Sequence, residues 1–420
     1  MRITCVGGGP AGLCTAIGAR RAGIADEVVV VERNPAGVTH GWGVTFWDEL
    51  LDALHRHDPP TARALRDAAV VWNGQVLQVD RRAPVFLGGS GYAVGRHDLL
   101  ELLTTRARAL GVDVRFGAST DEVDDAVAGA DLVVAADGIA SGLRRSRAHH
   151  LGADVREGGH RYIWLGSPHP FTTFTFAFVG TPAGWIWCYA YVFGPERSTV
   201  VVECAEATWR GLGLDTMPTD DCLRTLEKLF AHLLDGAPLW VAPSQRPAEG
   251  APAPWVNFRR VDNRQWHDGR MVIAGDAAHT THFSIGSGTT LALGDAMALT
   301  RHLATTDLGD ESSLERGLDA YEAERKAVLR PLQAEADHST AWFTGLTDGG
   351  APSEGLGDGR DDLALGWALS QRCHGEPTWR WYLLRATQRP AVRALRSSAE
   401  SVRRELRAQR RELVGQGRRS

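Results

Sequence analysis

Two glycine-rich loops, near opposite ends of the chain, carry residue types that bind phosphate and other polar ligand groups. The first loop follows an apolar run at residues 3–6 and has glycines at positions 7, 9 and 12. Gly7 permits a tight turn, Gly9 lets the backbone approach a pyrophosphate, and Gly12 lets a helix pack closely on a strand. A second apolar run ends at Glu32, 20 residues beyond Gly12, where an acid accepts hydrogen bonds from ribose hydroxyls. This βαβ pattern predicts a dinucleotide site.

The second loop, residues 275–290, places an acid and several glycines between a predicted strand at 271–274 and a predicted helix. The acid is Asp276, and Gly286 and Gly288 precede the helix. The first N–H groups of a helix lack intrahelical partners and carry partial positive charge. A phosphate or a developing anion is therefore stabilised at this point of the chain.

Composition excludes several classes of function. The 420 residues carry a net charge of −5, which does not favour a nucleic-acid partner. No apolar run approaches the roughly 20 residues needed to span a bilayer. The six cysteines show no Cys-x-x-Cys spacing, so free buried thiols are expected and no metal site. We therefore expect a cytoplasmic protein, a monomer or homodimer, with no nucleic-acid, membrane or metal partner.

A third motif lies between the two loops and identifies a family. It reads Asp137-Gly138-x-x-Ser141-x-x-Arg144 and follows a predicted buried strand. In their order and spacing, the three motifs resemble those of the class A flavoprotein monooxygenases, which share the para-hydroxybenzoate hydroxylase-like fold. Arg96, at the start of a predicted helix, resembles the arginine that contacts the flavin in that family. The resemblance covers about residues 1–345.

One departure from the usual family pattern suggests a narrower branch. Four residues after Gly275-Asp276-Ala277-Ala278-His279, the common form has proline, whereas this sequence has Phe283. Together with Gly41-Trp42-Gly43-Val44 and Tyr162-Ile163-Trp164, this variant resembles the branch that holds salicyloyl-CoA 5-hydroxylase, 2-aminobenzoyl-CoA monooxygenase and the tryptophan hydroxylase of the violacein pathway.

The resemblance implies an α/β fold, with a Rossmann-like FAD-binding domain, an inserted antiparallel-sheet substrate domain and C-terminal helices. Alternating aromatic residues at 174–178 and 185–193 independently indicate antiparallel strands. The expected FAD-binding domain comprises residues 1–69, 95–155 and 262–343. The expected substrate domain comprises 70–94 and 156–261, and 344–420 form a C-terminal helical region.

The resemblance also implies FAD as cofactor and NADH or NADPH as co-substrate. The residues expected to bind the cofactor lie in the motifs and their flanks: Gly7, Gly9, Pro10, Ala11, Gly12, Glu32, Arg33, Trp42, Gly43, Val44, Arg96, Asp137, Gly138, Gly275, Asp276, Gly286, Gly288 and Thr289.

The implied reaction is aromatic hydroxylation with NAD(P)H and O2 through a flavin C4a-hydroperoxide. The implied substrate is electron-rich: an aryl-CoA, a carrier-linked aryl group, or an indole or tryptophan derivative. His282 and Phe283 are the candidate catalytic residues. His282 either orients the substrate and moves a proton, or is a packed, hydrogen-bonded histidine. Trp185, Trp187 and Tyr189 either line the substrate or belong to the core.

Three other functions fit the same motifs. A halogenase shares the fold, but it needs a lysine in the pocket, and both lysines, Lys228 and Lys326, fall in predicted helices away from the site. A flavin-dependent reductase would consume NAD(P)H without hydroxylating an aromatic compound. A non-catalytic flavin-binding protein would show no turnover.

Overall fold

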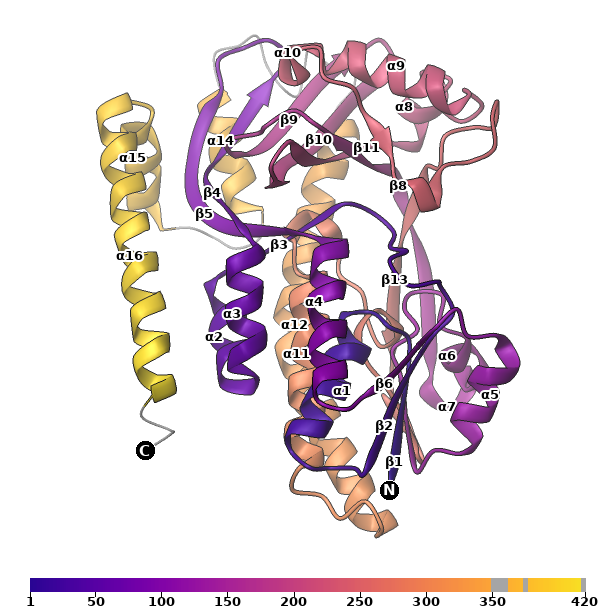
Figure 1. Ribbon diagram of the computed structural model, residues 1–420. Coiled ribbons are helices and arrows are strands. Elements are labelled where there is room, and N and C mark those ends of the chain that lie inside the picture. The colour runs from indigo at the N-terminus through magenta and orange to yellow at the C-terminus, as the bar shows by residue number, and fades with distance from the viewer. Residues whose placement is uncertain (349–361, 373–376, 417–420) are drawn as a thin grey trace.

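The computed structural model describes residues 1–348, 362–372 and 377–416. The chain folds around two β-sheets, which we call sheet A and sheet B (Figure 1). Sheet A lies in the half of the molecule that contains the N-terminus, and sheet B forms the other half. The long strand β8 (Ala153–Ser167) and its neighbour β13 (Val256–Asn263) run between the two halves.

Sheet A has the strand order β14-β15-β7-β1-β2-β6, and all its pairs are parallel except β14 with β15. Its strands are β1 (Arg2–Val6), β2 (Glu27–Glu32), β6 (Asp113–Phe116), β7 (Leu132–Ala135), β14 (His267–Asp268) and β15 (Met271–Ile273). The central strands β1, β2, β7 and β15 are short and mainly apolar because helices cover both faces. Helix α1 (Pro10–Arg21) packs on α4 (Arg96–Ala109) and α11 (Gly288–Leu303), and α5 (Thr120–Ala128) covers β1 and β2.

Sheet B has the order β12-β8-β11-β10-β9-β4-β5-β3, with β13 also paired to β8. Its other strands are β3 (Gly43–Phe46), β4 (Val70–Val79), β5 (Val85–Gly95), β9 (Phe174–Thr181), β10 (Gly184–Gly194), β11 (Arg197–Ala205) and β12 (Trp240–Val241). The strands of residues 153–205 are antiparallel, as expected. The sheet as a whole is mixed, because β4 pairs with β9 in parallel. This pairing joins two segments distant in sequence, so no hairpin turn in the sequence predicts it.

Each face of sheet B has its own core. One face packs on α8 (Glu206–Gly211), α9 (Thr219–Leu229) and α10 (Ala231–Leu234). The other face carries the aromatic side chains of β9 and β10 and packs on α12 (Glu311–Asp348) and α14 (Asp362–Gln371). The sequence predicts a bend or an interruption at Pro331, and α12 continues through this residue without an interruption. Because α12 also packs on α11, it ties sheet B to sheet A.

The remaining helices lie at the edges of this arrangement: α2 (Asp48–His57), α3 (Pro59–Ala68), α6 (Gly142–Ser146), α7 (Ala148–Leu151), α15 (Thr378–Thr387) and α16 (Pro390–Gln416), with 3-10 turns η1 (Pro243–Gln245), η2 (Gly275–Ala277) and η3 (Phe283–Ile285). Among the helices of the described ranges, none is long and apolar enough to cross a membrane.

The expected architecture is confirmed: a parallel sheet with a dinucleotide-type βαβ unit, a second sheet inserted in the chain, and C-terminal helices. Two details differ from the expectation. The second sheet is not purely antiparallel, and β3, which falls within residues 1–69, hydrogen-bonds to β5 and belongs to sheet B. The expected domain boundaries therefore do not coincide with the sheets at β3: this strand falls in the expected FAD-binding domain but belongs to sheet B.

Candidate active site

The first glycine loop joins β1 to α1 and leaves space above the helix N-terminus. Gly7 has a φ of +112°, and a Cβ on Gly12 would lie 2.0 Å from the carbonyl oxygen of Gly7. A Cβ on Gly9, in contrast, would meet nothing within 4 Å. Gly9 caps α1 without a side-chain hydrogen bond, so the first amides of α1 face open space. Gly7 and Gly12 serve chain packing, and Gly9 leaves room for a ligand.

Glu32 lies at the end of β2 and faces this loop. Its Oε2 accepts a hydrogen bond from the Gly8 amide at 2.7 Å, and its Oε1 accepts from the Asn34 amide at 2.8 Å. Oε1 also accepts from the side-chain amide of Asn34 at 2.7 Å, which fills its two lone pairs, so Oε2 is the oxygen that retains acceptor capacity toward a ligand hydroxyl. The neighbouring Arg33 is exposed.

The second motif is linked directly to the loop after β15. Oδ2 of Asp137 accepts from the Gly142 amide at the start of α6 at 2.7 Å, while its buried Oδ1 has no partner. Arg144 is buried and donates to the carbonyl oxygen of Ala277 at 3.0 Å. Two motifs about 130 residues apart in sequence therefore meet at one end of sheet A.

Asp276 projects from this loop into an exposed position between two arginines. Desolvation by the surrounding protein raises the pKa of the Asp276 carboxyl, and the positive charge of Arg96 is the main effect that lowers it. Burial lowers the pKa of Arg96, against the attraction of Asp276. The structure thus brings Arg96, at the N-terminus of α4, together with Asp276 and Arg144 as the sequence motifs predict.

A buried ionic cluster that the sequence motifs do not reveal fixes the Asp276 loop. Asp295 of α11 accepts from the Gly275 amide at 2.9 Å, and its Oδ2 lies 2.8 Å from Nε2 of His279. Arg325 of α12 donates to the other oxygen of Asp295 at 2.7 Å. Burial raises the pKa of Asp295, but His279 and Arg325 outweigh it and the net shift is downward.

The loop that follows positions His282 and Phe283 against the aromatic face of sheet B. Nδ1 of His282 accepts from the Ser284 amide at 3.3 Å and so caps η3. The Phe283 ring contacts Tyr162 of β8, with ring centroids 4.6 Å apart. Gly286 ends the turn at a φ of +65°, where a Cβ would lie 2.9 Å from the Thr45 hydroxyl. A Cβ on Gly288 would meet nothing within 4 Å, and α11 begins there without a side-chain cap.

A completely buried carboxylate, Glu203, lies at the centre of this aromatic face. Its Oε1 lies 3.0 Å from Nδ1 of His160 and 3.4 Å from Nε2 of His282. Its Oε2 accepts from the Tyr189 hydroxyl at 2.8 Å and from the Trp187 indole at 3.1 Å. The sequence motifs do not identify Glu203 or His160. One feature of the sequence could have indicated Glu203: it is the single acid in the apolar run 200–204 and, by the alternation of a strand, it lies on an inward face.

The charge state of Glu203 follows from its partners. Burial raises the pKa of this carboxyl, but His282 and His160 together outweigh burial and lower it to about 2. Burial, and next the Glu203 charge, raise the pKa of Tyr189 well above its ordinary value. Near neutral pH, Glu203 is therefore an anion that can stabilise positive charge on a neighbouring histidine.

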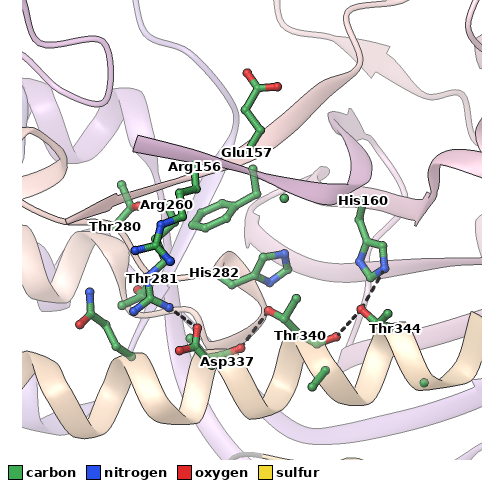
Figure 2. A pocket seen from close by; sticks show the side chains of 17 residues that line it. Arg156, Glu157, His160, Arg260, Thr280, Thr281, His282, Asp337, Thr340 and Thr344 are labelled. Carbon is green, nitrogen blue, oxygen red and sulfur yellow. Dashed lines mark hydrogen bonds and ion pairs between the residues drawn. The ribbon is translucent and has the colours of Figure 1, made fainter. Parts of the chain in front are cut away.

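A cavity of about 530 Å³ opens beside this cluster, between β8, β13 and α12. His160 and His282 both line it, and Figure 2 shows them side by side above Thr340 and Thr344 of α12. The Thr344 hydroxyl lies 3.4 Å from Nε2 of His160. Arg156, exposed at 69%, lines the outer part of the cavity, which therefore reaches the surface. The volume lies within the ~300–1,000 Å³ typical of ligand pockets.

Other predicted site residues contact or belong to sheet B. Trp42 and Gly43 contact sheet B: a Cβ on Gly166 would meet the Trp42 ring at 2.6 Å, and the Gly43 amide donates to Thr199 at 2.8 Å. Val44 is buried in β3. Trp185, Trp187 and Tyr189 lie in the buried aromatic cluster and do not line the 530 Å³ cavity. Their cofactor and substrate roles stay predictions.

The polar and open groups of the first region fit an FAD molecule. Gly9 and Gly288 leave space at two helix N-termini, which suit phosphate and the negatively charged edge of an anionic ring. Glu32 and Asp276 supply acceptors for hydroxyl groups, and the buried Oδ1 of Asp137 lacks a partner. Of the five cysteines in the described ranges, all are buried and free; Cys373 lies outside those ranges.

Comparisons with known proteins agree with this assignment. Residues 1–336 match the FAD binding domain family. The chain is 36% identical to salicyloyl-CoA 5-hydroxylase of a Streptomyces species over 82% of its own length, but it spans only 65% of that relative. It is also 36% identical to 3-hydroxy-4-methyl-anthranilyl-[aryl-carrier protein] 5-monooxygenase of Streptosporangium sibiricum, covering 87% of this chain and 93% of the relative.

Two further matches are more distant. Protodeoxyviolaceinate monooxygenase of Chromobacterium violaceum is 30% identical, covering 82% of this chain and 89% of the relative. The structure of 2-methyl-3-hydroxypyridine-5-carboxylic acid oxygenase superposes with a TM-score of 0.61 at 19% identity, over 81% of this chain and 89% of that one, and supports the fold alone. The chain therefore belongs to the FAD binding domain family, within the branch of FAD-dependent aromatic monooxygenases that the three sequence motifs indicate.

Proposed function

We propose that the chain hydroxylates the aromatic ring of an aryl thioester, with FAD as cofactor and NAD(P)H and O2 as co-substrates. The observation that carries this proposal is the position of the 530 Å³ cavity. Its inner wall includes Thr281 and His282, six residues or fewer beyond Asp276, and its outer part reaches the surface at Arg156. A ring bound at the inner end would leave a path outward for a long acyl-carrier arm.

The relatives support a thioester rather than a free acid. The two relatives of 36% identity are named for a CoA thioester and for a carrier-protein thioester of substituted benzoic acids. Both substrates combine a small ring with a long flexible arm. The cationic side chains near the mouth are already paired: Arg156 with Asp154, and Arg260 with Asp262 and Asp337. Because these arginines are already paired with carboxylates, the mouth favours recognition of the neutral part of the arm, which CoA and carrier thioesters share.

The cofactor roles proposed for the chain follow from where each group lies. Glu32 would hold ribose hydroxyls, Asp276 the ribityl chain, and the open amides at Gly288 the pyrimidine edge of the ring. The oxygenation is chemistry that reduced FAD and O2 supply, and the protein's part is to bind, to orient the ring and to exclude water.

The geometry divides the proton chemistry between two histidines. Both ring nitrogens of His282 are engaged, one by the Ser284 amide and one by Glu203, so His282 suits a positioning role that holds Phe283 in place. His160 lines the cavity and faces Glu203 through Nδ1. We propose that His160 takes the proton that the hydroxylated ring releases, and that the Glu203 carboxylate stabilises the resulting imidazolium.

The other functions receive less support. None of the residues that line the cavity is lysine; Lys228 is exposed on α9, and Lys326 is bound to Glu322 and borders a different, smaller cavity. This arrangement does not favour halogenation. Indole-type substrates remain the second candidate, because the relative of 30% identity is named for protodeoxyviolaceinate.

A substrate panel tests the proposal. The purified protein with FAD is incubated with NADH or NADPH and salicyloyl-CoA, 2-aminobenzoyl-CoA, the corresponding free acids, or indole derivatives. We expect a product about 16 mass units heavier, one oxygen atom, with thioesters favoured over free acids by at least about 10-fold in kcat/KM. Hydroxylation of free acids or indoles without any thioester turnover would reject the thioester. NAD(P)H consumption with no hydroxylated product would indicate a reductase.

A further inference from the structure

Helix α16 lies along the outside of the molecule with one side against the body and the opposite side exposed (Figure 1). On the inner side, Arg411 forms ion pairs with Asp48 and Asp52 of α2. Arg404 donates to the Asn73 side chain of β4 at 2.8 Å. These contacts fix which side of the helix faces outward.

The outer side carries an apolar stripe that the fold leaves in contact with solvent. Leu395 is 72% exposed, Val402 54%, Leu406 60% and Leu413 69%. A solvated helix face ordinarily carries charged residues at such positions, and scattered single apolar residues need no explanation. Four large apolar side chains on one line of one helix do need one.

The spacing of the stripe is that of a coiled-coil seam. If Leu395 is placed at position d of a heptad, Val402 also falls at d, and Leu406 and Leu413 fall at a. Ala399 and Gln409 occupy the remaining a and d positions. In the same register Arg404 and Arg411 fall at f, the position furthest from a coiled-coil partner. The residues that hold α16 to the body thus leave the a/d seam free for a second helix.

The charged residues that flank the seam favour a second copy of α16 as the partner, in the parallel orientation. Arg403 and Arg410 occupy e positions, and Glu405 and Glu412 occupy g positions, all of them exposed. In a parallel pair, g of one helix faces e of the next heptad of the other, so that Glu405 faces Arg410 of a second copy. In an antiparallel pair, e faces e and g faces g, which places arginine against arginine and glutamate against glutamate.

We propose that α16 forms a parallel two-stranded coiled coil with α16 of a second copy of this chain. The seam buries Leu395, Val402, Leu406 and Leu413, and reciprocal Glu405–Arg410 pairs set the register. Because each body attaches at the f side, the two bodies lie on opposite sides of the coil, related by a two-fold axis parallel to α16. The helix itself is self-complementary in charge, whereas an acidic partner such as a carrier protein would meet Glu405 as a repulsive charge; Glu412 pairs with Arg66 of the same chain at 3.2 Å.

Variants that introduce or reverse charges at the seam test this proposal on the full chain. The mass is measured by light scattering after gel filtration at several protein concentrations. The wild type is expected at twice the 45.5 kDa of one chain. V402E/L406E should weaken the dimer by at least about 100-fold, because it places charges in the seam. A394E, an exposed substitution on the same helix outside the seam, should leave the dimer intact.

The decisive variants reverse the charges. E405R alone should weaken the dimer about 10-fold or more, because the new guanidinium would face that of Arg410 in the second copy, and E405R/R410E should restore it. A wild type that stays monomeric at all concentrations, or a double reversal that fails to restore a dimer lost in E405R, would overturn the proposal. So would a monomeric wild type whose V402E/L406E variant selectively loses turnover of carrier-linked substrate, which would assign the face to a carrier protein.

Discussion

At the scale of single residues, Glu203 is a completely buried carboxylate that needs charged and hydrogen-bonding partners. A buried carboxylate is costly unless it is paired and hydrogen-bonded. Four side chains supply those partners: His160, His282, Trp187 and Tyr189. Substitution of Glu203 consequently affects both stability and proton chemistry, and pH separates the two effects.

The stability effect of Glu203 should depend on pH in a defined direction. Folding lowers the pKa of this carboxyl from 4.5 to about 2, so its contribution is complete above pH 4.5 and is lost as the pH falls toward 2. The shift corresponds to about 3 kcal/mol. We expect Glu203→Gln to unfold more easily than wild type by about that amount at pH 7, with a difference that shrinks by pH 3, measured by urea denaturation. A difference independent of pH would contradict a charged Glu203.

The proton-transfer role of His160 makes a separate prediction. His160→Gln should lower the rate of hydroxylated product formation about 100-fold, a typical effect of a lost general acid–base group, while leaving FAD affinity unchanged. The rate should recover in part at high pH, where hydroxide replaces the missing base. His150→Gln, at an exposed histidine of α7, is the control. An equal fall in FAD affinity would instead indicate a purely structural residue.

Neither His160 nor Glu203 could be predicted as a site residue from local spacing. They are 43 residues apart and meet only through the pairing of β8 with β11, which places Glu203 opposite Tyr162. The glycine loops, by contrast, were predictable, because φ values such as the +112° of Gly7 exclude other residues for reasons confined to a few neighbours.

Two glycines of one loop should respond differently to alanine. At Gly9, φ and ψ are −79° and 179° and a Cβ meets nothing, so Gly9→Ala should leave the apoprotein's melting temperature unchanged but weaken FAD binding at least about 10-fold. At Gly12 a Cβ would lie 2.0 Å from a backbone oxygen, so Gly12→Ala should destabilise the apoprotein itself. Calorimetry of the apoprotein and fluorescence titration with FAD distinguish the outcomes. Unchanged FAD affinity in Gly9→Ala would argue against a pyrophosphate above this helix.

At the scale of elements, α11 and α12 together fix the Asp276 loop. Asp295 of α11 binds the Gly275 amide and His279, and Arg325 of α12 binds Asp295. The sequence predicts a helix at the position of α11. It does not reveal that Asp295 faces inward, because an acid within a helix is ordinarily solvated.

Removal of the Asp295 charge should therefore act through the loop. Asp295→Asn keeps the size of the side chain but leaves Arg325 buried without its anion, and we expect a loss of about 3 kcal/mol in the free energy of unfolding, with weakened FAD binding as a consequence. Asp319→Asn, at an exposed acid on α12, should change neither property appreciably. If Asp295→Asn retained full stability, the ionic cluster would not be what fixes the loop.

At the scale of the whole molecule, the cavity exists because two units meet. Its walls come from β8 and β13, which run between the sheets, from the loop after β15 of sheet A, and from α12, which spans both (Figures 1 and 2). The sequence predicts strands and helices of each unit but not this junction, because β8 and β13, the loop after β15 and α12 come from segments distant in the chain.

Filling the cavity from α12 tests whether it holds the substrate. Thr340 lines the cavity, whereas Ala327 is exposed on the same helix and lies outside it. Thr340→Phe should lower kcat/KM for an aryl thioester at least about 10-fold, mainly through KM, because the larger ring occupies space that the substrate needs. FAD affinity and the slow NAD(P)H oxidation without substrate should not change, and Ala327→Phe should match wild type. Since the substitution leaves the Glu203 cluster and both glycine loops untouched, unaltered thioester turnover in Thr340→Phe would mean that the ring reaches the cofactor by another route.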